Sequence, residues 1–313
     1  MRVFGWSEAV DALEFSSLIE ALRQAFRSAD TTTPAPHRHA ISAPPDLSGT
    51  LQISPAWRIG DQIGVKITAA FDATSGGPGG EGAYVLLDAR TGEPLAVFDA
   101  AALTTRCTAA ASALAASYLA RPDCERLLLI GGGLFASHLL AAHASMRPIR
   151  NVLVWDRDND KAERLAHRLT RRTLKVAATD DLQRAVNGAY IVCCLAAEAA
   201  PILDGHWLPL GVHLDLVSGA TPALRQADDE TLRRARIFVD TREKALAEAA
   251  DLAQPIRAGA FNPDDVAGDL FDLTRGTRAG RRFHDQITFF KSVGHALADL
   301  AAAKQGLENA LAP

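Results

Sequence analysis

One stretch, Leu127 to Ala136, constrains the fold of this chain more than any other. It reads LLLIGGGLFA, so an apolar run stops at three glycines and a helical pattern follows at once. Gly131, Gly133 and Ala136 have the spacing G-x-G-x-x-A, which is typical of a dinucleotide-binding turn. Gly131 permits the tight turn, Gly133 lets a pyrophosphate approach the backbone, and Ala136 lets helix and strand pack closely. The alternative is an ordinary structural turn between a strand and a helix.

A second strand favours the nucleotide interpretation. Val152 to Trp155 is apolar and ends in Asp156, roughly 25 positions after Gly131, close to where an acidic residue binds the ribose hydroxyls. The free N–H groups and the positive dipole end of the helix after the glycines would face the phosphates. Asp156 favours NAD over NADP because a carboxylate repels a 2′-phosphate, although the adjacent Arg157 could hold such a phosphate.

From Arg126 onward, segments with strand character alternate with segments of helical spacing. This alternation is typical of a doubly wound parallel sheet. Right-handed crossovers bring the carboxyl ends of the strands to one edge, where ligands bind. We therefore predict an α/β fold of the Rossmann type, with strands at 126–130, 152–155, 174–178, 190–194, 213–217 and 236–239 and helices at about 134–146, 159–171, 180–187 and 228–234.

The first third of the chain has a different pattern. Residues 7–28 have helical spacing of apolar residues, and residues 30–45 form a polar, proline-rich link. Short runs of strand-forming residues follow. We predict a helix in front of an antiparallel sheet, with strands at 51–53, 63–71, 84–87 and 95–98 and a glycine-rich flexible loop at 75–82.

Three further elements complete the prediction. An alanine-dense helix is expected at 101–120, a short strand at 287–290 and a long helix at 292–310. Ser292 is the candidate N-cap of the last helix.

Length and composition exclude several classes of protein. The chain has 313 residues, which suggests two domains, and a net charge of −4 without a basic stripe argues against nucleic-acid binding. The four cysteines form no C-x-x-C pair, and we find neither a signal-peptide pattern nor a membrane-spanning apolar stretch. We therefore expect a cytoplasmic protein without a membrane partner. The nine histidines lack metal-ligand spacing and no G-x-S-x-G motif occurs, so we expect neither a metal nor a hydrolase triad.

Several segments, in the right order along nearly the whole chain, resemble the ornithine cyclodeaminase/mu-crystallin family. Each segment is modest by itself, whereas the ordered set is specific. The segments are Pro36-His-Arg38, Gly64-Val-Lys66, Thr91-Gly-Glu-Pro-Leu-Ala96, Leu103 to Ala113, the glycine motif as far as Leu139, Val239-Asp240 and Thr288 to Gly294.

The resemblance implies a two-domain enzyme that uses NAD, or alternatively NADP. Residues 1–118 together with 288–313 would form an α+β domain that binds the substrate and builds a homodimer, completed by the C-terminal helix. Residues 119–287 would form the Rossmann dinucleotide-binding domain.

The resemblance also assigns the candidate site residues. Arg38 and Lys66 match an arginine and a lysine that hold the carboxylate of a small amino or imino acid, and Lys66 is the candidate catalytic residue. A guanidinium fork suits a carboxylate, and a lysine can act as a second cation or a proton source. Arg106 would assist in binding the substrate. The expected coenzyme-binding residues are Gly131, Gly133, Ala136, Asp156, Arg157, Ser292 and Gly294.

Two departures from the family pattern limit the functional prediction. The family places an arginine where Cys107 stands, and Arg106 is one position earlier, a rotation of about 100° on a helix. Ornithine cyclodeaminases carry an acid/base aspartate where Ala220 stands, and alanine cannot carry a proton. Asp215, on the preceding strand, is either a substitute acid or a structural carboxylate.

These features together predict an NAD(P)-dependent oxidoreductase acting on a CH–NH group. We expect an amino-acid dehydrogenase or an imine or ketimine reductase, because reduction of an imine needs less proton handling than a deaminating lyase. Two alternatives stay open: an ornithine cyclodeaminase, which converts ornithine to proline and ammonia, and a non-catalytic protein that binds a ligand together with NAD(P)H.

Overall fold

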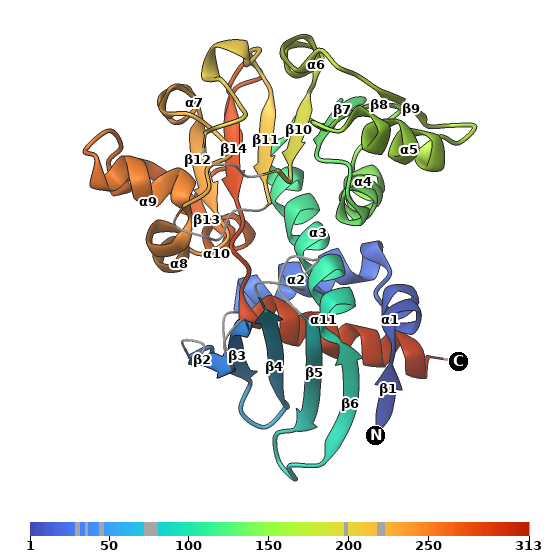
Figure 1. The fold of residues 1–313 in the computed structure, drawn as a ribbon. Coiled ribbons are helices and arrows are strands. Elements are labelled where there is room, and N and C mark those ends of the chain that lie inside the picture. The colour runs from blue at the N-terminus through green and yellow to red at the C-terminus, as the bar shows by residue number, and fades with distance from the viewer. Residues whose placement is uncertain are drawn as a thin grey trace. The chain divides into compact units, whose positions relative to one another are not determined.

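The computed structural model describes residues 1–28, 32–34, 37–43, 47–71, 81–196, 200–217 and 223–312, and the side chains at 38, 40–48 and 134 are outside the description. Two compact units follow from the contacts within the chain. Unit 1 comprises residues 1–110 and 294–313, and unit 2 comprises residues 111–293 (Figure 1). We describe each by itself. The domain division expected from the sequence, at 118/119 and 287/288, stays a prediction.

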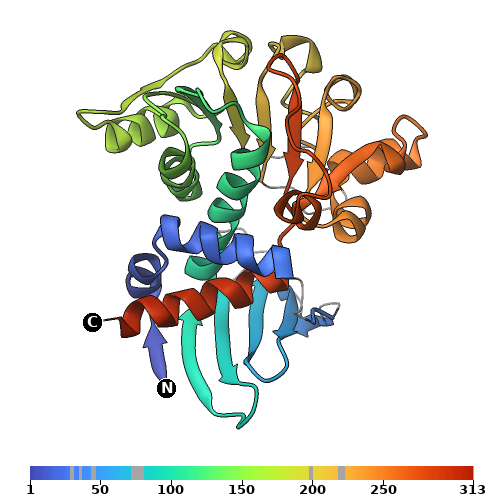
Figure 2. The same cartoon turned by 180° about the vertical axis from the view of Figure 1, so that it is seen from behind.

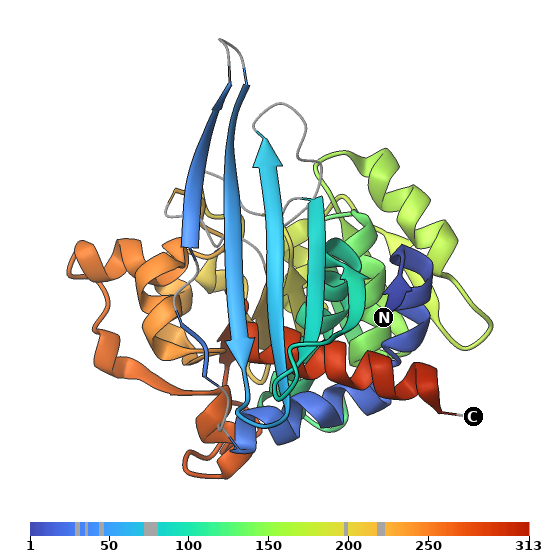
Figure 3. The same ribbon diagram turned by 90° about the horizontal axis from the view of Figure 1, so that it is seen from below.

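Unit 1 contains a six-stranded sheet in the order β1-β6-β5-β4-β3-β2. The five strands from β2 to β6 pair antiparallel, and Figure 3 shows the blue to cyan strands lying side by side. The first strand, which the sequence analysis missed, pairs parallel with β6. The bounds are β1 Arg2–Phe4, β2 His37–Ala43, β3 Leu47–Trp57, β4 Gln62–Phe71, β5 Glu81–Asp88 and β6 Pro94–Asp99.

Two predictions for this unit are wrong. The link expected at 30–45 contains strand β2, which forms a regular antiparallel register with β3. The helix expected at 7–28 is two helices, α1 (Trp6–Ala12) and α2 (Phe15–Ser28). The chain leaves the helical conformation at Leu13, and the Glu14 carboxylate accepts a hydrogen bond from the backbone N–H of Ser17 at 3.1 Å at the start of α2. The loop expected at 75–82 lies outside the described residues as far as position 80, and Glu81 and Gly82 open β5.

The last helix, α11 (Ala296–Leu311), packs on one face of this sheet. It contacts β3, β4 and β5, and it lies alongside α2, as Figure 2 shows for the red and blue helices. Its N-cap is His295, whose ring accepts the N–H of Leu297, so the predicted N-cap Ser292 is wrong. The apolar face of α2 is buried beneath it, through Phe15, Leu18, Ile19, Leu22 and Phe26.

Unit 2 contains an eight-stranded, entirely parallel sheet in the order β13-β12-β14-β11-β10-β7-β8-β9. The predicted doubly wound Rossmann-type fold is therefore confirmed. The strands are β7 Arg126–Ile130, β8 Asn151–Trp155, β9 Lys175–Ala178, β10 Ile191–Cys194, β11 His213–Leu216, β12 Arg236–Val239, β13 Val266–Asp269 and β14 Thr288–Lys291.

The helices of unit 2 connect these strands. Four predicted helices are confirmed within a few residues, as α4 Leu134–Met146, α5 Asn159–Leu169, α6 Leu182–Gly188 and α7 Asp229–Arg234. Strand β13 and three helices between β12 and β14 were not predicted; the helices are α8 Arg242–Glu248, α9 Ala250–Arg257 and α10 Leu270–Arg275. Among the described helices, none is long and apolar enough to cross a membrane. Helix α3 (Ala100–Leu119) belongs to unit 1 up to Ala110 and to unit 2 thereafter.

The central strands of unit 2 are buried on both faces. All residues of β10 and β11 and four of the five in β7 are buried, as expected for parallel strands covered on both sides. Burial of each large aliphatic side chain contributes roughly 1.5–3 kcal/mol. This core fixes the carboxyl edge of the sheet, where the candidate ligand-binding residues lie.

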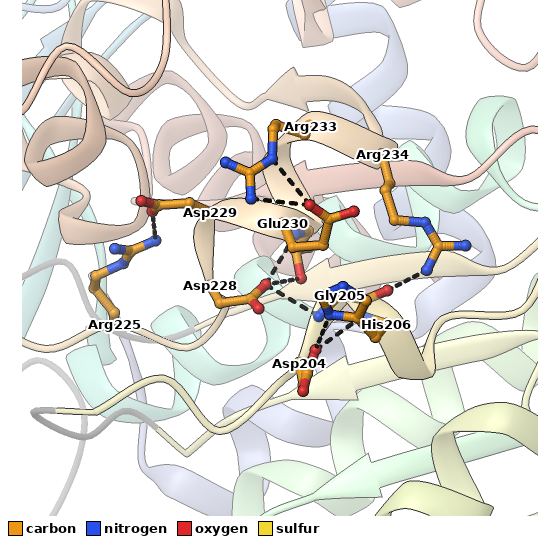
Figure 4. Close-up of polar contacts among 10 residues, drawn as sticks. Asp204, Gly205, His206, Arg225, Asp228, Asp229, Glu230, Arg233 and Arg234 are labelled. Atoms are coloured by element: carbon orange, nitrogen blue, oxygen red, sulfur yellow. Dashed lines mark hydrogen bonds and ion pairs between the residues drawn. The ribbon is translucent and has the colours of Figure 1, made fainter.

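The segment between β10 and β12 is held by a compact polar cluster (Figure 4). One oxygen of Asp228 accepts the backbone N–H groups of Gly205 at 3.0 Å and Thr231 at 2.8 Å. These two hydrogen bonds connect the short 3₁₀ helix η1 (Gly205–Trp207) to α7. A Cβ at Gly205 would lie 2.4 Å from the backbone nitrogen of Thr231, so only glycine fits this crossing.

Candidate functional site

The glycine turn after β7 has the conformation that the sequence predicted. Gly131 has φ +110°, a region that side chains disfavour, and its N–H donates to the carbonyl of Trp155 at 2.8 Å. A Cβ at Gly131 would lie 3.3 Å from that of Leu195, in the segment after β10. The turn is thus fixed between the ends of β8 and β10.

The acidic residue at the end of β8 contacts the same turn. Asp156 accepts the N–H of Gly132 with one oxygen at 2.6 Å and the N–H of Asp158 with the other at 2.9 Å. The carboxylate is thereby held beside the glycines, with further lone pairs for a diol. Arg157 follows it and is exposed.

Gly133 is the N-cap of α4 and leaves room for a ligand. Its dihedral angles are extended (φ −73°, ψ 173°), no side chain caps the helix, and a Cβ at this position would meet nothing within 4 Å. Ala136 is fully buried one turn further on. Open space beside uncapped helix N–H groups suits a phosphate group. These residues therefore fit the diphosphate of a dinucleotide.

A closed network lies at the carboxyl edge of β14. The Lys291 ammonium pairs with Asp251 at 2.8 Å and donates to the side-chain oxygen of Gln226 at 2.6 Å, and both ion-pair partners are fully buried. The Gln226 amide in turn donates to the carbonyls of Cys194 at 2.6 Å and Ala196 at 3.2 Å. The network therefore fixes the backbone after β10, next to Gly131.

A second carboxylate orders the residues that follow β14. Asp240 accepts the Ser292 hydroxyl at 3.1 Å and the N–H of Val293 at 2.7 Å. Ser292 thus serves the backbone of unit 2 rather than the cap of α11. Gly294 opens the C-terminal segment of unit 1 with φ +79°.

In unit 1, Lys66 on β4 forms an ion pair with Asp299 on α11. Nζ lies 2.7 Å from Oδ2, and the lysine side chain is 16% exposed. Burial alone lowers the pKa of the ammonium, but the charge and hydrogen bond of Asp299 outweigh it, so the pKa of Lys66 is raised above its ordinary value. Lys66 is therefore held in its protonated form, with partial access to solvent.

Two uncharged groups complete the surroundings of this pair. Tyr84, opposite Lys66 on β5, is buried, and its hydroxyl has no hydrogen-bond partner among the described residues. Its oxygen would lie 1.9 Å from a Cβ at Gly64, so the glycine of the Gly64-Val-Lys66 segment makes room for the ring. Cys107 on α3 also contacts Asp299, and burial raises the pKa of its thiol well above the ordinary range.

The structure does not bring Arg106 to Lys66. Its guanidinium donates to the carbonyl of Leu13, with Nε at 2.8 Å, and stacks on Phe15 with Cζ 3.5 Å from the ring centroid. Burial lowers the pKa of Arg106 to about 10, although the negative charges of Glu14 and Asp11 act to raise it. The assignment of Arg106 to the substrate stays a prediction, and these contacts do not support it. The Arg38 side chain lies outside the described part of the chain.

Asp215 belongs to a closed internal cluster of unit 2. It is fully buried and accepts Ser112 Oγ at 3.0 Å, while its second oxygen lies 3.0 Å from His143 Nε2. Cys193 lies within 4.8 Å of the same ligand atoms, a grouping that the histidine spacing did not predict. These partners satisfy the carboxylate internally, so its structural role is the one that the geometry supports. Ala220 lies outside the described residues.

Two surface hollows are lined by other parts of the described chain. One is at the amino edge of the unit 2 sheet beside Arg236 and Phe283, and the other is in unit 1 beside Phe4 and Asn309. Neither is lined by a predicted site residue.

Sequence and structure comparisons identify the relatives of the chain. A delta(1)-pyrroline-2-carboxylate reductase of Paracoccus denitrificans is 36% identical over 305 residues, covering 96% of this chain and 95% of that protein. A protein of the same name from Colwellia psychrerythraea is 33% identical over 316 residues, covering 98% and 99%. The solved structure of Thermococcus litoralis delta(1)-pyrroline-2-carboxylate reductase, in complex with NADH and L-proline, has a TM-score of 0.90 at 27% identity, covering 99% of this chain and 98% of that one.

The family itself matches over residues 4–313. The match covers nearly the whole chain, so the predicted resemblance is confirmed. The chain belongs to the ornithine cyclodeaminase/mu-crystallin family.

Proposed function

We propose that this protein is an NAD(P)-dependent reductase of a small cyclic imine that bears a carboxylate, such as Δ1-pyrroline-2-carboxylate. Two relatives that match almost the full chain carry that activity in their names, and the T. litoralis enzyme binds NADH and L-proline. The predicted class, an oxidoreductase acting on a CH–NH group, agrees with them. The observation that carries the proposal is the partly exposed Lys66 ammonium, held as a cation by Asp299.

Each unit supplies one part of the reaction. In unit 2, Gly131 and Gly133 would hold the diphosphate of the coenzyme, and Asp156 would hold the ribose. A coenzyme held there would supply the hydride for the imine carbon. In unit 1, Lys66 binds the substrate carboxylate and stabilises negative charge, and its ammonium is also a proton donor for the imine nitrogen. Arg38, on β2 of the same sheet, is the second proposed carboxylate ligand.

NAD is the proposed coenzyme, and Asp156 is the reason. Its carboxylate lies at the turn, bonded to Gly132, where a 2′-phosphate would meet a negative charge. We also propose that the protein is a homodimer, as the family resemblance implied.

The lyase alternative is not favoured. A deaminating cycle needs an additional acid/base, and Ala220 replaces the one that the family uses. Asp215 is fully buried and bonded to Ser112 and His143, so it does not replace that acid.

A coenzyme oxidation assay tests the proposal. Purified protein is mixed with NADH or NADPH and with Δ1-pyrroline-2-carboxylate, its six-membered analogue, or α-keto acids plus ammonia, and loss of reduced coenzyme is followed by absorbance. We expect turnover with the cyclic imines and a preference for NADH. Ammonia released from ornithine, without imine reduction, would instead establish the lyase.

A further inference from the structure

We propose that Asp299 is a positioning residue of the reaction, which keeps the Lys66 ammonium charged and oriented toward the substrate carboxylate. This inference rests on the proposed function and deepens it. Asp299 lies in the first turn of α11, in a segment that sequence patterning indicates only as a packing helix.

The geometry shows a specific contact. Nζ of Lys66 and Oδ2 of Asp299 are 2.7 Å apart, and the carboxylate is 8% exposed while the lysine is 16% exposed. An ammonium has three N–H donors, so one bond to Asp299 leaves capacity for a carboxylate and an imine nitrogen. Because the pair joins α11 to β4, the aspartate also fixes the direction of a long and otherwise flexible side chain.

Anchoring of the helix does not require this pair. Lys304, further along α11, pairs with Asp61 at 2.7 Å, and Asp61 directly precedes β4. Both of these side chains are more exposed, at 35% and 31%, and the pair attaches the same helix to the residue just before the same strand. The Lys66–Asp299 pair lies deeper, beside Tyr84 and Cys107, so its desolvation cost is larger than that of the Lys304–Asp61 pair.

The negative charge of Asp299 raises the pKa of Lys66. Among the described side chains, the titratable groups facing Lys66 are Asp299 from α11, Cys107 from α3 and Tyr84 from β5. Burial raises the pKa of both the thiol and the phenol, so both stay neutral, and Asp299 is the only negative charge among these three. Without that charge, burial would lower the pKa of Lys66 below its ordinary value.

The test compares Asp299→Asn, Asp299→Glu and the matched control Asp61→Asn. For each protein, kcat and KM for Δ1-pyrroline-2-carboxylate with NADH are measured from about pH 6 to about pH 10.5. We expect the basic limb of kcat/KM to move down by roughly 1–3 pH units in Asp299→Asn, with a smaller shift in Asp299→Glu. The control should keep the wild-type profile, and NADH affinity should be unchanged in all three.

A second measurement does not depend on turnover. Protein labelled with ¹³C at the lysine ε carbons is titrated by NMR, with the Lys66 resonance assigned from its absence in Lys66→Arg. We expect the Lys66 pKa to fall in Asp299→Asn and to stay at the wild-type value in Asp61→Asn. If Asp299→Asn fails to fold, Asp299→Glu should still show a smaller shift in the same direction.

The outcomes separate the two proposals. Wild-type protein that reduces no imine refutes the proposed function, whereas the NMR titration still decides whether Asp299 controls Lys66. An unchanged Lys66 pKa and an unchanged pH profile in both Asp299 variants would overturn the inference, even with a fully active wild type.

Discussion

Two lysine–aspartate pairs in this protein have nearly the same distance between nitrogen and oxygen but differ in their exposure to solvent. Lys66 and Asp299 lie 2.7 Å apart in unit 1, and Lys291 and Asp251 lie 2.8 Å apart in unit 2. The second pair is fully buried, whereas 16% of the Lys66 side chain is exposed. A sequence pattern does not distinguish them, because both lysines occur in strands beside apolar residues.

The difference lies in how the remaining hydrogen-bonding capacity is used. Lys291 also donates to Gln226, and Asp251 accepts the N–H groups of Gln226 at 2.6 Å and Ala227 at 3.0 Å. That pair is part of the architecture of the sheet edge. Lys66 keeps partial exposure and is therefore suited to a ligand. A cation whose hydrogen-bonding capacity is filled by protein groups has a structural role. A cation with unused hydrogen-bonding capacity can bind a ligand.

The largest expected effect comes from replacing Lys66. Lys66→Met should lower kcat/KM for the cyclic imine by about 10³-fold, because the carboxylate loses a cation and the nitrogen a proton donor. Affinity for NADH, measured by fluorescence titration, should change by less than about threefold. Lys304→Met, which breaks the other pair on α11, is the control and should keep wild-type activity. Equal losses of coenzyme affinity and turnover in Lys66→Met would show that the site is misplaced.

The second-largest expected effect is on stability, and it concerns the fully buried pair of Lys291 and Asp251. Asp251→Asn leaves the buried Lys291 ammonium without its counter-ion, and we expect it to lower the free energy of unfolding by about 3 kcal/mol. Asp299→Asn should cost less, because Lys66 is partly solvated. Denaturant unfolding of the two variants provides the measurement. A greater loss in Asp299→Asn would reverse the comparison.

The third and smaller expected effect is on coenzyme binding, which involves neither lysine–aspartate pair. Asp156→Ala should weaken NADH binding by roughly tenfold, since hydrogen bonds to a charged group contribute about 1.5–3 kcal/mol. NADPH binding should weaken less, because a repulsive charge is also removed. Asp158→Ala is the matched control, since Asp158 caps α5 and accepts the N–H of Asp160. A wild-type protein that prefers NADPH would contradict the assignment of NAD.

The smallest expected effect tests Arg106. Arg106→Gln should change kcat/KM by less than about threefold, because the guanidinium is bound to the Leu13 carbonyl and stacked on Phe15. Loss of that hydrogen bond should lower stability by about 1–3 kcal/mol, which thermal unfolding would detect. A fall in kcat/KM of a hundredfold or more, at unchanged stability, would restore Arg106 as a substrate ligand.

Sequence reasoning succeeded where local pattern determines structure. The alternation of strands and helices from Arg126 predicted the parallel sheet, and the glycine spacing predicted the turn at Gly131. It failed where a short segment depends on distant partners. Strand β1 forms because β6 pairs with it, and β2 because β3 does. The break between α1 and α2 was missed because the apolar spacing continues through Leu13.

The candidate site shows the same division. Family resemblance indicated Lys66, but Gln226 and Asp251 carried no signal of their own. An acidic residue among the apolar positions of α11 was the one available hint, because a charge on a buried helix face needs a partner.

By itself, the sequence determined the fold class and the coenzyme turn, because these depend on periodicity and on spacing over a few residues. It indicated the family only through a resemblance carried by an ordered set of segments along nearly the whole chain. Tertiary structure alone decided that Cys107 rather than Arg106 contacts Asp299. It also decided that the Lys66 side chain is partly exposed to solvent while the Lys291 side chain is fully buried. The physical reason is that one step along a helix turns a side chain by about 100°. Solvation of a charge is likewise set by elements that meet only when the chain folds.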